Sequence, residues 1–143
     1  MTELEFYREL YKNADTGYDA ISILMPKTTD EKLRHDMALH MDGYRYFARL
    51  AKEKINDAHE DAKKENPLVQ IPARIGMMMH TVMDRSTSHM AELMINGSNM
   101  GIIDMTKNLN RMKEKENTEE AQEVCQRVID FEQDNIKRMK KYI

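Results

Sequence analysis

Hydrophobic residues recur every three or four positions along most of the chain, which is the spacing of a helix with one buried face. The first such stretch, residues 2 to 25, predicts a helix. Pro26 is expected to end this helix, because proline lacks an N–H and biases the residue before it away from helical geometry. One of residues 28 to 30, all Thr or Asp, is then expected to cap the next helix.

The same spacing predicts a second helix over residues 30 to 64, which the Asn66-Pro67 pair is expected to end. The third periodic segment, residues 72 to 115, is the longest, and its apolar face is wide enough to need more than one neighbouring helix. Two glycines and a Ser-Asn pair interrupt it at residues 97 to 101. A kink, a bulge or a close backbone contact is expected there, with the helix continuing beyond. Thr118 is expected to start a fourth helix.

These elements predict an all-α protein of one domain, residues 1 to 143, folded as an antiparallel four-helix bundle with two long central helices. Short connections give an up-down-up-down order. The second and third helices are the longest, so their far ends, residues 51 to 82, are expected to project as an apolar arm. Two such arms paired across a two-fold axis predict a homodimer through the second and third helices.

Charge and cysteine content narrow the partners and the compartment. A third of the residues are charged, but the net charge is only −3 and the signs alternate. No polybasic run indicates nucleic acid or an anionic membrane, and no apolar stretch is long enough to span a bilayer. The acidic first residues do not resemble a signal peptide, and the single Cys125 forms no internal disulfide. A cytoplasmic location is therefore expected.

Methionine is unusually frequent, with fourteen residues and no tryptophan. Because methionine is a helix former that fills irregular gaps, an adaptable core is the first interpretation of this composition. A deformable interaction surface is the second.

Several polar residues interrupt the predicted core and could bind a transition metal such as iron, manganese or zinc. His40 lies on the stripe of the second helix and His89 at the edge of the third helix's apolar face. Counting outward from the predicted turn places the two histidines at one level. The candidate ligands are His40, His89, Asp36 and Glu92. The alternative is a neutral core histidine that pairs with Tyr44, Ser86 or a carboxylate.

A second polar pair, Glu132 and Asn135, interrupts the stripe of the fourth helix. The same counting places the pair near residues 97 to 101 and several turns from His40. We expect the pair to bond the disturbed backbone there, and a ligand-binding role is the alternative.

Four strings of the sequence resemble the ferritin-like superfamily, and in particular small uncharacterised ferritin-like proteins of anaerobic Firmicutes. They lie at residues 9 to 14, 86 to 92, 94 to 101 and 131 to 136. The resemblance covers nearly the whole chain and implies the fold rather than an activity. The di-iron site of that superfamily needs Glu-x-x-His motifs, and this chain has none. The nearest substitutes are Asp36 with His40, and His89 followed by Glu92, which argues against ferroxidase or oxygenase chemistry.

Three functional hypotheses follow. The first is a non-enzymatic cytoplasmic bundle that acts through binding or assembly. The second is a metal-binding or redox protein with a degenerate ferritin-type site. The third is a Met-rich arm that holds a hydrophobic ligand or a partner helix, which an open apolar groove between the long helices would support.

Overall fold

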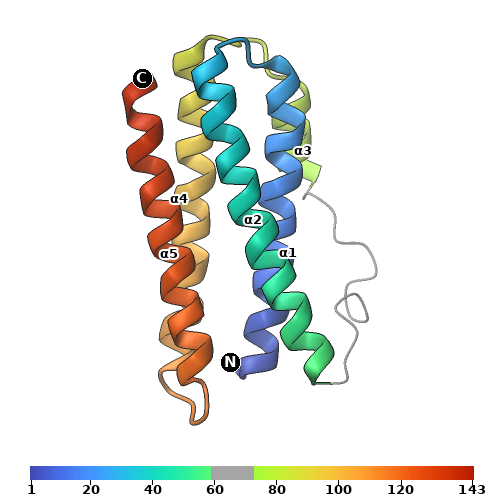
Figure 1. Cartoon of the computed structure of the whole chain (residues 1–143), viewed down its shortest axis with the longest axis vertical. Coiled ribbons are helices and arrows are strands. Elements are labelled where there is room, and N and C mark those ends of the chain that lie inside the picture. Colours follow the sequence, from blue (N-terminus) through green and yellow to red (C-terminus); the bar gives the residue numbers. More distant parts are fainter. Residues whose placement is uncertain (59–72) are drawn as a thin grey trace.

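The computed structural model of the chain describes residues 1–58 and 73–143. In this part of the chain, four main helices pack as two antiparallel hairpins (Figure 1). One hairpin pairs α1 (Glu3–Leu24) with α2 (Glu31–Asp57), and the other pairs α4 (Thr87–Met112) with α5 (Glu119–Met139). The shorter elements are α3 (Ala73–His80) and the 3₁₀ turns η1 (Met25–Lys27) and η2 (Lys140–Tyr142). The all-α bundle is confirmed.

Local polar side chains begin the long helices. Thr2 and Glu5 form a reciprocal capping box at the start of α1. Asp30 accepts a hydrogen bond of 2.8 Å from the amide of Leu33, which confirms a cap within residues 28 to 30. Pro26 is the second residue of η1, and η1 begins directly after the last residue of α1. The first boundary expected from the sequence is therefore correct.

The order of the helices differs from the expected one. α1 runs from the lower end of the bundle to the upper end, and α2 returns to the lower end (Figure 1). α4 starts at the upper end again, so α2 and α4 run in the same direction, and α5 ends beside the C-terminus at the top. The up-down-up-down order is wrong for this middle pair. The two helices are joined by a crossover that includes α3, not by a short turn.

The third predicted helix is divided at a different place from the expected one. Residues 81 to 86 separate α3 from α4, because Asp84 Oδ1 accepts a hydrogen bond from the amide of Ser86, and Ser86 in turn caps α4 through the amide of His89. The helix is continuous through Gly97 and Gly101, as expected, and of the features expected there the close contact is observed, between Gly101 and the Glu132 side chain. α2 ends at Asp57, before the expected Lys64, and the Asn66-Pro67 pair lies outside the described residues.

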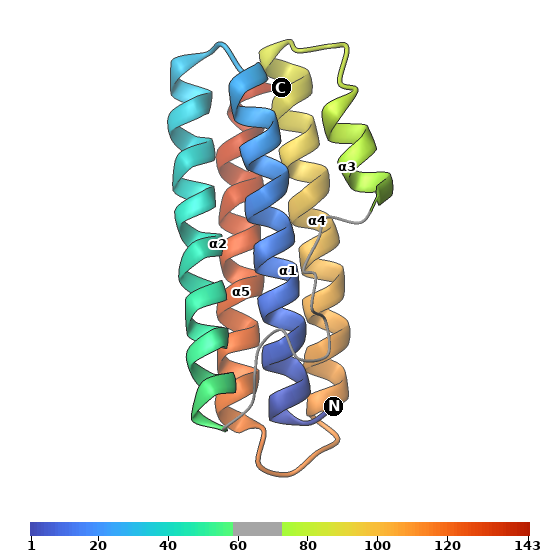
Figure 2. The ribbon, with the colours of Figure 1, turned by 90° about the vertical axis from the view of Figure 1, so that its right-hand side faces the viewer.

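The projecting arm does not form in the described part of the chain. Ala51 and Ile55 are fully buried inside the bundle, and Met79 and Val82 are also buried. α3 lies along the upper part of α1 and beside α4 instead of extending the bundle (Figure 2). The homodimer expected through such an arm stays a prediction.

The buried apolar residues form two clusters along the bundle. The lower cluster includes Phe6, Leu10 and Phe47, and the upper cluster includes Leu24, Leu33 and Met37. Tyr44 packs against both clusters. On each of α2, α4 and α5, buried polar residues lie between the residues of the lower and upper clusters. The core is therefore divided by a polar layer near the middle of the bundle.

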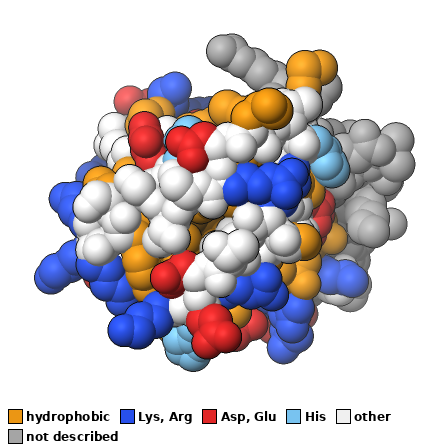
Figure 3. Space-filling model, turned by 90° about the horizontal axis from the view of Figure 1, so that it is seen from above, with side chains coloured by type: hydrophobic (Ala, Val, Ile, Leu, Met, Phe, Trp, Pro, Cys, Tyr) orange, Lys and Arg blue, Asp and Glu red, His pale blue; other side chains and the backbone are white. Residues whose placement is uncertain are grey.

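The surface mixes charges of both signs. Lys, Arg, Asp and Glu side chains alternate around the upper end of the molecule, with hydrophobic side chains between them (Figure 3). Of the described helices, none is both long and apolar enough to cross a membrane.

Candidate functional site

The polar layer brings side chains from three helices together in the core. Its members are His40 from α2, Ser98 from α4, and Glu132 and Asn135 from α5. Each is only 1% exposed. A carboxylate and an imidazole removed from water to this degree lose hydration that the protein must replace.

The imidazole of His40 is held mainly by aromatic contacts. Its ring stacks on Tyr44 with centroids 4.7 Å apart, and the Phe131 ring meets it edge to face with centroids 5.4 Å apart. His40 Nε2 lies 3.5 Å from Ser98 Oγ and 3.8 Å from Glu132 Oε1. The Glu132 distance is too long for a hydrogen bond, so the pair is adjacent without being bonded.

Several atoms of the layer lack hydrogen-bond partners in the described structure. They are both carboxylate oxygens of Glu132, Nδ1 of His40 and Nδ2 of Asn135. The Asn135 amide oxygen, by contrast, accepts a hydrogen bond of 3.0 Å from Arg138. Buried polar atoms in native proteins are nearly always paired, so a group of unpaired atoms in one layer marks a place that can bind a polar group of a ligand.

Burial also changes the titration of Tyr44. Loss of solvent around the phenol, together with the neighbouring Glu132 carboxyl group, raises the pKa of Tyr44 above its ordinary value. The phenol therefore stays protonated at neutral pH and can donate a hydrogen bond.

Glycines allow the helices to approach this layer closely. A Cβ atom at Gly101 would lie 3.3 Å from the carboxyl carbon of Glu132, and one at Gly17 would lie 2.7 Å from the Tyr44 ring. The absence of a side chain at Gly101 lets Glu132 reach the surface of α4. Gly97 has no atom within 4 Å of an added Cβ, so this stretch of α4 borders open space.

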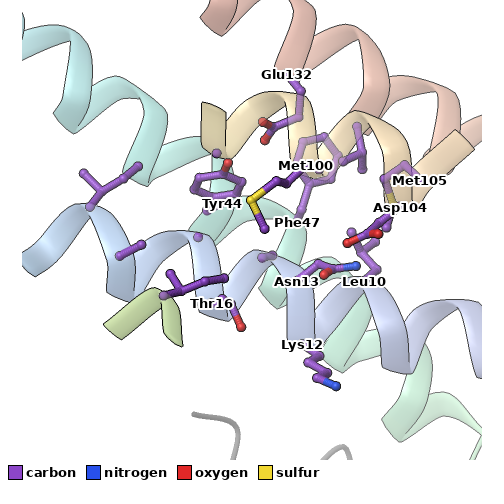
Figure 4. A pocket seen from close by; sticks show the side chains of 18 of the residues that line it. Leu10, Lys12, Asn13, Thr16, Tyr44, Phe47, Met100, Asp104, Met105 and Glu132 are labelled. Atoms are coloured by element: carbon purple, nitrogen blue, oxygen red, sulfur yellow. The ribbon is translucent and has the colours of Figure 1, made fainter. Parts of the chain in front are cut away.

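His40 and Glu132 of the polar layer form the floor of a groove between α1 and α4, with a cavity volume of about 510 Å³. Figure 4 shows the Glu132 carboxyl group, the Tyr44 ring and the Met100 thioether extending into it. Its upper half, beneath α3, is lined by apolar side chains: Ile21, Leu24, Ile75, Met79, Leu93 and Met94. Its lower end carries exposed charges: Glu9, Lys12, Asp104, Lys107 and Arg111. The groove is thus apolar at one end, polar at its buried centre and hydrated at the other end.

The four candidate metal ligands do not meet. Asp36 accepts a hydrogen bond from Tyr142 and pairs with Lys141 at 3.0 Å, while His40 lies in the polar layer. His89 Nδ1 lies 3.8 Å from Glu92 Oε2 in a pair that is largely exposed. Within the described residues, no three His, Cys, Asp or Glu side chains are grouped so that they could hold a metal ion. Metal binding at these residues stays a prediction, and the four side chains share no common site in the described structure.

One expected placement near the layer is correct, because Glu132 lies beside Gly101, as counting from the turns indicated. His40 contacts Tyr44, one partner in the alternative interpretation, by ring stacking and not by a hydrogen bond. The expectation that His40 lies several turns from Glu132 is wrong, because the count assumed a hairpin between the second and third helices. Ser98 and the groove itself were missed. The Ser98 side chain had a sequence signal, since it is a polar residue in an otherwise wide apolar face.

The thiol of Cys125 does not contribute to this site. Burial raises its pKa to about 12, and Sγ donates a hydrogen bond to the carbonyl of Met105. Cys125 is a buried core residue rather than a reactive thiol.

Comparison of the chain with models of known families, with curated proteins and with solved structures finds no match. The functional argument therefore depends on the geometry of the groove and its polar floor.

Proposed function

We propose that this protein is a non-enzymatic binding protein that holds a small, mostly apolar molecule in the groove between α1 and α4. The observation that carries the proposal is the combination of an apolar cavity with a buried polar floor whose atoms lack partners. Small-molecule sites are concave, mostly apolar and contain few polar groups, and their volumes lie in the range of about 300–1,000 Å³. The groove, at about 510 Å³, falls within this range.

The composition of the walls supports a groove whose upper part accepts apolar groups of different shapes. Met78, Met79 and Met94 line the upper part of the groove, and Met100 and Met105 line the rest. Methionine side chains are flexible and polarisable, so they repack around apolar molecules of different outline. The high methionine content thus supports the hypothesis of a hydrophobic ligand, with the groove between helices in place of the projecting arm.

The topology supports a relationship with ferritin-like bundles. Bundles of that kind contain one long crossover connection, and the connection between α2 and α4 is long and includes α3. Under this proposal the fold is ferritin-like, and the position of a di-iron centre is taken by aromatic rings and the polar layer. A protein of this kind binds in the cytoplasm without catalysing a reaction.

Methyl signals of ¹³C-labelled methionine test the proposal, because methionines lie both in the groove and away from it. Titration with 1-octanol, a neutral amphiphile, is expected to shift the signals of Met94, Met100 and Met105 in a saturable manner. The signals of Met112 and Met139, which do not line the groove, are expected to stay in place.

A matched pair of variants locates the binding site. Gly97→Phe places a ring in open space on the groove wall and is expected to weaken octanol binding on the order of tenfold. Asn99→Phe adds the same ring to an exposed position of α4 that does not line the groove, and is expected to leave binding unchanged. Equal binding to both variants, or shifts spread over all methionines, would contradict the proposal.

A further inference from the structure

The carboxyl group of Glu132 has an unusual position, because it is buried, lines the groove and receives no hydrogen bond in the described structure. Its nearest basic neighbour, His40, is 3.8 Å away and lies slightly closer to Ser98 than to Glu132. A buried carboxylate without donors is costly, and removing such a cost requires a positively charged donor or several neutral ones. Neither His40 nor the neighbouring Tyr44 hydroxyl group makes such a bond to Glu132 at normal hydrogen-bonding distance.

We propose that the ligand is a primary amine with an apolar body, and that its ammonium group pairs with Glu132. This inference rests on the proposed function and adds the chemistry of the head group. A hydrogen bond between ammonium and carboxylate is charge-assisted, and it is stronger than one from a neutral hydroxyl group. The aromatic rings of Tyr44 and Phe47 also line the groove, and aromatic rings attract a cation rather than an anion.

The position of Glu132 orients the apolar body of this amine toward α3. At the level of Glu132, α1 contributes Gly17, which contacts Tyr44, and the apolar wall continues from there to Leu24. These residues are separated by about 10 Å along the helix axis. An alkyl chain of about that length fills the upper half of the groove, with its ammonium group at the polar floor.

The lower end of the groove offers a competing site for a head group of opposite charge. Lys12, Lys107 and Arg111 line it, but Glu9 and Asp104 lie among them, and all five side chains are exposed. Exposed charges of mixed sign are hydrated and screened, so they have little need of a ligand ion. Glu132 is buried and accepts no hydrogen bond at normal distance, so the amine is the favoured ligand.

Three ligands with one chain length separate these cases: octylamine, 1-octanol and octanoate, titrated at pH 7 with methionine methyl signals as the readout. Octylamine is expected to bind on the order of tenfold more tightly than 1-octanol, and octanoate most weakly. In Glu132→Gln, octylamine is expected to lose this advantage while 1-octanol binds as before. The control Asp104→Asn neutralises an exposed carboxylate at the lower end, and is expected to keep the preference.

A second variant retains the charge and guards against a folding defect in Glu132→Gln. Gly101→Ala places a methyl group 3.3 Å from the Glu132 carboxyl carbon, and is expected to weaken octylamine more than 1-octanol. Equal affinity for the three ligands would overturn the proposal of an amine ligand, but would leave the proposed binding of an apolar molecule in the groove standing. If octanoate binds most tightly and loses this affinity in Lys107→Gln, the proposal of an amine ligand is overturned. The head group would then lie at the lower end of the groove. No saturable binding of any ligand would overturn the proposed function as well.

Discussion

Glycine residues in the long helices have opposite environments, and this difference determines what a single methyl group does. A Cβ atom at Gly43 would lie 2.1 Å from Cε2 of Phe131, which itself packs against His40, Tyr44 and Phe47. A Cβ atom at Gly97 meets nothing within 4 Å. Both residues are inside α-helices, so the gain in helix propensity from alanine is the same in both cases.

We predict that Gly97→Ala stabilises the protein by about 0.5–1 kcal/mol, because alanine loses less backbone entropy on folding. Gly43→Ala is expected to destabilise it by about 1–3 kcal/mol, because the Phe131 ring must leave its place among the other aromatic rings. Urea unfolding followed by circular dichroism measures both changes. Shifts of the same sign and size at the two positions would show that the rings around Phe131 are not closely packed.

At this scale the sequence indicates which residues are unusual, but not which of them meet. Glu132, Asn135 and His40 are recognisable as polar residues on apolar stripes, and Glu132 was correctly placed beside Gly101. The meeting of His40 with Glu132 depends on how α2 is aligned with the hairpin of α4 and α5, which no local pattern encodes. The cavity could not be predicted, since it arises from the separation of α1 and α4.

The end of the chain is attached to the body of the bundle by one carboxylate. Asp36 of α2 accepts a hydrogen bond from the hydroxyl of Tyr142 in η2, and Lys141 pairs with the same oxygen at 3.0 Å. Burial alone would raise the pKa of Asp36, but these two hydrogen bonds and the charge of Lys141 outweigh it and lower the pKa. The ionised form of Asp36 therefore holds η2 against α2.

We predict that Asp36→Asn lowers the free energy of unfolding by about 1 kcal/mol at pH 7. A carboxyl group whose pKa is lowered by folding stabilises the native state above its unfolded pKa, about 3.9 for aspartate. This contribution is lost as the pH falls through the folded-state pKa. The difference between wild type and variant is therefore expected to be constant from pH 7 to about pH 5 and to shrink below about pH 4. A difference that persists at pH 3 would show that the effect is not ionic.

At the scale of elements, the sequence predicts where helices start better than how far they continue. A cap within residues 28 to 30 and the stop at Pro26 were predicted correctly, because each depends on the side chain of that residue or on an immediate neighbour. The capping box of Thr2 and Glu5 was not predicted. The break at residues 81 to 86 was missed, since apolar periodicity continues across it. Asp84 and Ser86 carry the signal there, because both side chains bond to backbone amides that a continuous helix would use.

The whole molecule has a topology that depends on one connection. The sequence predicted four helices and two antiparallel pairs correctly, because periodicity and short turns determine both. It did not predict that α2 and α4 run in the same direction. A long apolar segment such as residues 72 to 115 is equally compatible with one continuous helix and with a short helix that folds back on its neighbour. Packing of α3 against α1, together with the hydrogen bonds of Asp84 and Ser86, favours the second arrangement.

This topology separates the four candidate metal ligands and leads to a prediction for the whole protein. Ser98, which lies next to His40, follows His89 by nine positions on α4, or about 13 Å along the helix axis. We therefore expect elemental analysis of native, untagged protein to find no near-stoichiometric iron, manganese or zinc that depends on both histidines. The single variants His40→Ala and His89→Ala provide the control. If metal is lost only in His40→Ala, the metal site is at the polar layer. If metal is lost only in His89→Ala, the metal site is at the exposed His89–Glu92 pair. Metal lost in each variant would require the two histidines to share a site, and would contradict the arrangement of α2 and α4 described here.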